Sequence, residues 1–228
     1  MKRPLAFALS GVLLIPILAF RFGGWVVVTV DDLPDHIVAG KPIALSFVVR
    51  QHGATPLDGL RPRVTLWSGL SKVTARATPS AAQGGYVATI TAPRAGDWTT
   101  TIESGFGGSE ITLLPLPAVA AGAPAPRAVG DAERGHALFF AKGCVTCHVR
   151  GSEGAGGVKP GPDLTGKRYV AEYVATFLAD PESSPLSRST TPSGTRMPNL
   201  GLREREIASL VAFLNADRSV MGKAASRW

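Results

Sequence analysis

The sequence predicts a chain of several parts: an N-terminal transmembrane or signal helix, an all-β sandwich and a small all-α domain. Three observations predict this: an apolar run behind two basic residues, a middle region rich in Val, Thr and Ile between turns, and a C-terminal region with apolar residues at helical spacing. A length of 228 residues leaves room for two small domains. The predicted boundaries are 1–24 for the first helix, 25–114 for the sandwich, 115–130 for a linker, 131–218 for the helical domain and 219–228 for a tail.

The N-terminal segment has the pattern of an exported chain. Lys2 and Arg3 precede an apolar run from Leu5 to Phe20. This run is shorter than the about 20 residues of a full span, but Arg21 can extend its side chain to the interface while the residues up to Trp25 prolong the apolar stretch. No Ala-x-Ala cleavage site follows. We therefore expect a retained signal anchor with the rest of the chain facing the periplasm, and a cleaved signal peptide is the alternative.

The middle region predicts seven short strands. Alternation is clearest where Trp98, Thr100 and Ile102 lie on one face of a strand and Thr99 and Thr101 on the other. Glycine, proline or aspartate separates most of these segments, which is typical of a small sandwich. The predicted strands are residues 25–30, 43–50, 62–67, 72–77, 86–91, 98–103 and 109–114.

Residues 115–130 are rich in proline and alanine and show no strand pattern, which predicts a semi-extended spacer. We expect this spacer to let the helical domain move relative to the sandwich.

The C-terminal region predicts three helices. The first is capped by Asp131 and runs to about Lys142, and the second covers Tyr169 to Ala179. The third carries an apolar stripe at i, i+3, i+4 and i+7, formed by Ile207, Leu210, Val211 and Leu214. No Ser, Thr or Asp precedes this last helix, so we expect its start to fray.

The segment Cys144-Val145-Thr146-Cys147-His148 contains both cysteines of the chain. Its spacing is typical of covalent haem attachment, in which each thiol adds to one vinyl group and the histidine lies under the iron. A disulfide, half of a zinc site and a thioredoxin-like redox pair are the alternatives. A zinc site needs a second ligand pair. A redox pair needs a βαβ context and does not require the trailing histidine.

Four motifs in this region together resemble the class I c-type cytochrome family over about residues 129–217. They are the helix from Gly135 to Gly143 before the haem motif, the loop Gly161-Pro162-Asp163-Leu164, the loop Arg196-Met197-Pro198 and the closing helix Ile207–Leu214. The resemblance implies one covalent haem c held by Cys144 and Cys147, with His148 and Met197 as axial ligands. It also implies that the carbonyl of Pro162 accepts from His148, and that Gly135, Phe139, Leu164 and Phe213 pack around the haem.

Methionine ligation predicts electron transfer, because a thioether favours ferrous iron and two strong axial ligands leave no open position. Only Met221 competes with Met197 outside the initiator. We expect an electron carrier or a haem subunit of a respiratory or photosynthetic complex, with redox proteins as partners and no small-molecule substrate. A haem enzyme or gas sensor with a labile sixth ligand is the alternative.

Residues 84–90, followed by Ala95-Gly96-Asp97-Trp98, resemble exported immunoglobulin-like domains of the YtkA/FixH type. Some related sandwiches bind copper, so His36 and His52 are candidate ligands and a copper-handling domain is a further alternative. No methionine cluster or cysteine accompanies them. The net charge of +7 is spread along the chain without a dense basic run, which argues against nucleic-acid binding.

Overall fold

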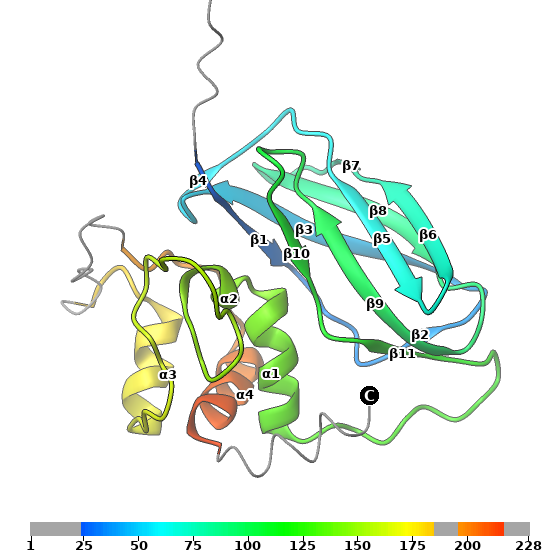
Figure 1. Cartoon of the computed structure of the whole chain (residues 1–228). Coiled ribbons are helices and arrows are strands. Elements are labelled where there is room, and N and C mark those ends of the chain that lie inside the picture. Colours follow the sequence, from blue (N-terminus) through cyan, green and yellow to red (C-terminus); the bar gives the residue numbers. More distant parts are fainter. Residues whose placement is uncertain (1–23, 185–195, 217–228) are drawn as a thin grey trace, which may run out of the picture.

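The computed structural model describes residues 24–184 and 196–216, and it consists of two stacked sheets beside a group of helices (Figure 1). The predicted N-terminal helix, apart from its last residue, and the predicted tail lie outside the described residues. No helix in the described ranges is long and apolar enough to cross a membrane.

The first sheet has five strands and is antiparallel throughout. Its order is β1 (Val26–Val30), β3 (Pro42–Gln51), β8 (Gly85–Thr91) and β7 (Thr78–Pro79), and β4 (Thr55–Pro56) pairs with the end of β3. In the register of β1 on β3, Val26 lies opposite Gln51 and Val30 opposite Phe47.

The second sheet has six strands. Its order is β2 (Ile37–Val38), β11 (Leu116–Val119), β9 (Gly96–Glu103), β5 (Arg63–Ser68) and β6 (Ser71–Arg76), and β10 (Glu110–Thr112) pairs with β9. The contact between β11 and β2 is parallel, and the other pairs are antiparallel.

The sandwich core lies between the two sheets and follows the predicted alternation. Phe47, Trp98 and Ile102 are fully buried in it. Tyr86 is also buried, and its hydroxyl donates to the carbonyl of Leu57 at 2.7 Å and accepts from the amide of Leu60 at 3.0 Å. The seven predicted strands are all present, with bounds that differ by a few residues, while β2, β4, β7 and β11 were not predicted.

Strand β11 corrects the predicted boundary between the sandwich and the linker. It occupies Leu116–Val119, inside the segment 115–130 that we expected to be a spacer without strands. Its residues pair with β9 on one side and with β2 on the other, so the sandwich extends to Val119. The proline-rich composition argued against a strand here, because proline has no backbone N–H to donate. The strand can still form, because the carbonyl of proline remains free to accept a hydrogen bond.

Four helices form the second domain: α1 (Asp131–Ala141), α2 (Cys144–Cys147), α3 (Ala171–Ala179) and α4 (Glu204–Asn215). Helices α1 and α4 cross in close contact. The sequence predicted Asp131 as the cap of the first helix. In the structure Gly130 holds the cap position, and no side-chain hydrogen bond caps this helix. Asp131 is instead the first helical residue, where its negative charge favours the positive end of the helix dipole.

The start of α4 is held more firmly than its sequence predicts. The Glu206 carboxylate accepts from the backbone amide of Arg203 at 3.0 Å, which satisfies a free donor at the helix start. The same carboxylate lies 2.8 Å from Nζ of Lys142, and both side chains are buried. The expected fraying is therefore wrong, because a glutamate in the first turn replaces the missing cap.

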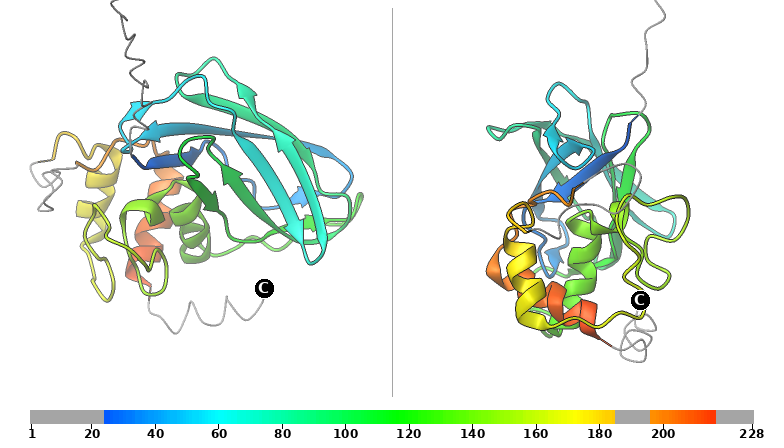
Figure 2. Two further views of the ribbon diagram at one scale, coloured as in Figure 1. Left: turned by 45° about the horizontal axis from the view of Figure 1, so that its top comes forward. Right: turned by 90° about the vertical axis from the view of Figure 1, so that its left-hand side faces the viewer.

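The two domains lie in contact, with α1 beside β1 (Figures 1 and 2). Ala141 of α1 packs into the sandwich core, and Ala137, Phe140 and Val145 pack against it. We expected the linker to let the helical domain move relative to the sandwich, and in the structure the two domains share an apolar contact.

Candidate cofactor site

The two cysteines lie at the ends of the short helix α2. Gly143, the residue before Cys144, has a φ of +77°, a left-handed conformation that glycine adopts without strain and that turns the chain from α1 into α2. Residues three apart in a helix lie on the same face, so the thiols of Cys144 and Cys147 point to one side. Both thiols are free and both line one cavity.

Both thiols are neutral at physiological pH. Burial raises the pKa of Cys144 to about 12, and the adjacent Cys147 adds to this effect. Burial also raises the pKa of Cys147, to about 11, although Lys159 opposes the shift. Reactive Cys-x-x-Cys pairs have lowered thiol pKa values. The raised pKa values of both thiols are thus unlike those of a thioredoxin-like pair.

His148 is oriented by the loop that follows the motif. Its Nδ1 lies 3.0 Å from the carbonyl oxygen of Pro162, the acceptor that the resemblance implied. Burial lowers the pKa of His148, and the hydrogen bond to Pro162 acts against this, so the ring is neutral. With Nδ1 donating, Nε2 is the nitrogen left to bind a metal.

Gly161 makes this close approach of the loop possible. A methyl group at this position would lie 2.5 Å from Cε1 of His148 and 2.7 Å from its Nδ1. The amide of Gly161 also donates to the carbonyl of Cys147 at 2.9 Å. The sequence pattern singled out the Gly-Pro pair but did not predict that its glycine is needed for contact with the imidazole.

Met197 lines the same cavity as the two cysteines and His148. It lies in residues 196–203, which form neither helix nor strand, and it packs against the apolar core of the helical domain. The alternative ligand Met221 lies outside the described residues. The structure thus brings a thioether to the cavity that holds the cysteines and the imidazole.

The cavity has a volume of about 440 Å³ and a mainly apolar lining. Phe139 and Leu164, two of the predicted packing residues, lie in its wall. Gly135 and Phe213 lie behind this wall, at the crossing of α1 and α4, and the rings of Phe213 and Phe139 are 5.4 Å apart. Of the four predicted packing residues, two therefore line the cavity and two support it.

Sequence reasoning missed several aromatic and basic residues of the wall. Tyr173 and Phe177 are one turn apart on α3, and Tyr169 precedes that helix. Lys167 and Arg196 also line the cavity. The i, i+4 spacing of Tyr173 and Phe177 was the available signal, but such a pair is equally typical of an ordinary helix packing face.

The donor set fits a covalently attached haem. Two neutral thiols, an imidazole with Nε2 unused by its backbone hydrogen bond, and a thioether meet at one apolar cavity. Thioether bonds, histidine ligation and methionine ligation are the interactions that hold haem in c-type proteins. Within the described ranges, no group of three or more His, Cys, Asp or Glu side chains could hold another metal ion.

The two histidines of the sandwich lie apart from this cavity. His52 is in the turn between β3 and β4, has a φ of +52°, and its ring lies 5.5 Å from the ring of Trp25. His36 immediately precedes β2. Neither belongs to a cluster of metal-binding side chains among the described residues.

Residues 132–216 match the family model described as cytochrome c. The chain thus consists of a β-rich N-terminal region followed by a helical cytochrome c domain, a family that carries covalently bound haem c. No curated protein matches the chain.

Two solved structures are similar to part of the chain. One is the surface layer protein SbsC, domains 1–6, with 21% identity and a TM-score of 0.30 over 42% of this chain and 13% of that one. The other is the CARDB domain of a Pyrococcus furiosus protein in complex with di-metal ions, with 15% identity and a TM-score of 0.24 over 42% of this chain and 89% of that one.

Proposed function

We propose that this chain is a membrane-tethered c-type cytochrome that transfers single electrons. In this proposal Cys144 and Cys147 hold one haem c, and His148 and Met197 are its axial ligands. The observation that carries the proposal is the single apolar cavity that gathers both cysteines, an oriented imidazole and a thioether. When bound, the haem supplies the one-electron redox chemistry.

The residues around the cavity set how readily an electron is accepted. Pro162 fixes the tautomer of His148 and increases its basicity through the hydrogen bond to Nδ1. Met197 offers a soft sulfur that stabilises the reduced state and raises the reduction potential. The mainly apolar lining makes the surroundings of the haem less polar, which also favours the state of lower charge.

Two strong axial ligands favour electron transfer over catalysis or gas sensing, because both of those functions need an open or labile position. The absorption spectrum of the oxidised protein tests this choice. We expect the weak long-wavelength band of methionine–Fe(III) ligation, and a high-spin spectrum would instead support an enzyme or sensor.

Acid–acetone extraction tests covalent attachment. Haem should stay with the wild-type polypeptide, and Cys144→Ala and Cys147→Ala should each retain one thioether bond and mature poorly. His52→Ala is the control, because it replaces a residue outside the cavity and should leave haem retention unchanged. Free extraction of haem from the wild-type chain would contradict the proposal.

Membrane tethering is supported by the sequence of residues 1–25, in which Lys2 and Arg3 precede the apolar run. A tether of this kind places the cytochrome domain in the periplasm, close to redox proteins or a membrane complex. The intact protein should resist washing with alkaline carbonate and keep its N-terminal peptide. Recovery as a soluble, trimmed periplasmic protein would remove the tether and leave the cytochrome function unaffected.

A further inference from the structure

Strand β1 contributes to two apolar surfaces at once. All five of its residues are buried. Val26, Val28 and Val30 belong to the sandwich core, so alternation places Val27 on the opposite face of the sheet. Val27 is nevertheless only 2% exposed, because the helical domain covers this face.

The turn before the haem motif lies against this strand. A methyl group added at Gly143 would lie 2.5 Å from Cγ1 of Val27 and 2.8 Å from the carbonyl oxygen of Val28. Gly143 immediately precedes Cys144. The backbone that presents the first thiol is therefore in direct contact with the sandwich.

The loop that carries Met197 lies against the same place. A methyl group added at Gly53 would lie 3.0 Å from Cγ of Pro198 and 3.4 Å from Cγ2 of Val27. Pro198 immediately follows Met197. We call Val27, Val28 and Gly53 the β1 patch, and this patch contacts residues next to both the first cysteine and the proposed distal ligand.

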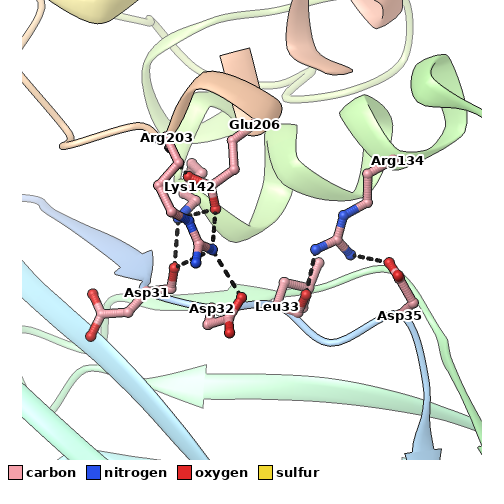
Figure 3. A network of polar contacts seen from close by, with 8 residues as sticks. All are labelled: Asp31, Asp32, Leu33, Asp35, Arg134, Lys142, Arg203 and Glu206. Atoms are coloured by element: carbon pink, nitrogen blue, oxygen red, sulfur yellow. Dashed lines mark hydrogen bonds and ion pairs between the residues drawn. The ribbon is translucent and has the colours of Figure 1, made fainter. Parts of the chain in front are cut away.

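Polar contacts also join the two domains, in the segment that follows β1 (Figure 3). Arg203 lies 2.9 Å from the carboxylate of Asp32, and Nζ of Lys142 donates to the carbonyl of Asp31 at 2.9 Å. Arg134 pairs with Asp35 at 2.9 Å. These basic residues come from or adjoin α1 and α4, the crossing helices behind the cavity, so the contacts join the sandwich to the frame of the site.

We propose that the sandwich is a positioning element of the haem site, in which the β1 patch holds the Met197 loop in its ligating position. Residues 196–203 form no regular secondary structure, so their place depends on side-chain contacts, and the packing of Pro198 against the β1 patch is one of these. Disturbing the β1 patch then increases the fraction of molecules in which Met197 leaves the iron. This inference rests on the proposed function, because it takes Met197 as the sixth ligand.

A matched pair of glycine variants in the full-length, haem-loaded protein tests this. Gly53 and Gly40 have almost the same φ, +77° and +75°, so alanine strains the backbone equally at both. A methyl group at Gly40 has no atom within 4 Å, whereas one at Gly53 meets Pro198. The probe is added imidazole, which binds ferric iron when the methionine leaves it.

We expect Gly53→Ala to bind imidazole about tenfold more tightly than wild type, because apparent affinity scales with the fraction of binding-competent molecules. The methionine band and the reduction potential should both fall. Gly40→Ala should stay within about twofold of wild type. Equal imidazole affinity in the two variants would overturn the inference.

A second pair of variants tests the same inference in case Gly53→Ala does not fold. Val27→Ala and Val64→Ala each remove two methyl groups from a buried side chain, but Val64 lies in the sandwich core between the sheets. Only Val27→Ala should tighten imidazole binding, and equal effects would show that general loosening of the sandwich is the cause. A wild-type protein without the methionine band would overturn the proposed function itself, whereas a normal band with no difference within either pair would overturn only the positioning role.

Discussion

Gly135→Ala probes the helix crossing that supports the cavity. The added methyl group would lie 1.9 Å from the carbonyl oxygen of Ser209 and 2.7 Å from Cβ of Phe213. Since packed carbon atoms prefer separations of about 3.5–4.0 Å, α1 and α4 have to move apart by roughly 1.5 Å.

The two physical effects of this substitution have opposite signs. Alanine in a helix is favoured over glycine by up to about 1 kcal/mol. Overpacking a well-packed contact costs about 1–3 kcal/mol, and here the fixed partner is main chain, which cannot rotate away. We expect a net loss of about 2 kcal/mol, which corresponds to a fall in melting temperature of roughly 10 °C for a domain of this size.

Thermal unfolding followed by circular dichroism at a helical wavelength measures this loss. Gly130→Ala is the matched control, because the same substitution one residue before the same helix meets open space and should cost less than about 1 kcal/mol. Adding Ser209→Gly to Gly135→Ala should not restore stability, since the clash is with the Ser209 backbone. A Gly135→Ala protein that melts at or above the wild-type temperature would refute the close crossing.

Three further changes test other parts of the structure. Burial alone would raise the pKa of Glu206, but hydrogen bonds from Arg203 and Lys142 hold this pKa below its usual range. The ionised Glu206 carboxylate therefore stabilises the fold at pH values above the ordinary carboxyl pKa, and this stabilisation is lost as the pH falls through the lowered pKa. Glu206→Gln should cost about 3 kcal/mol at neutral pH by leaving Lys142 buried without a countercharge, and urea titrations should show a flatter acid dependence than wild type. Tyr86→Phe should cost about 1 kcal/mol, because two partly buried backbone groups lose their partner, and tryptophan fluorescence should report this in the sandwich. Met197→Ala should keep the helical circular dichroism signal but lose the long-wavelength band and lower the measured reduction potential, and an unchanged spectrum would exclude Met197 as the ligand.

Local patterns predicted much of the fold. The seven predicted strands and the helices α1, α3 and α4 follow from alternation and helical spacing, which side-chain burial enforces. Strand β11 could not be found in this way, because Leu116 and Pro117 show no alternation and the strand exists only through its pairing with β9 and β2. At the start of α4, Glu206 is a local signal for the contact with the Arg203 amide, whereas its ion pair with Lys142 joins residues far apart in the sequence.

The features of the candidate site also separate into those that the sequence predicts and those that depend on packing between the domains. Cys144, Cys147 and His148 lie within five consecutive residues, so their spacing alone indicates their chemistry, and the family resemblance implied Met197 and Pro162. The contact of Pro198 with Gly53 could not be predicted, because neither residue belongs to a chemical motif and the contact depends on how two domains pack.

The position of β1 at the edge of its sheet affects the solubility of incompletely folded chains. In the part of the chain that the structure describes, β1 pairs with β3 alone, so it is the edge strand of its sheet. Its sequence of four valines and one threonine is the kind of uncharged, β-branched edge that recruits further strands when it is exposed. A chain whose helical domain has not folded uncovers this edge, and such chains will self-associate. We therefore expect variants whose helical domain fails to fold to collect in aggregates and not to accumulate as soluble protein.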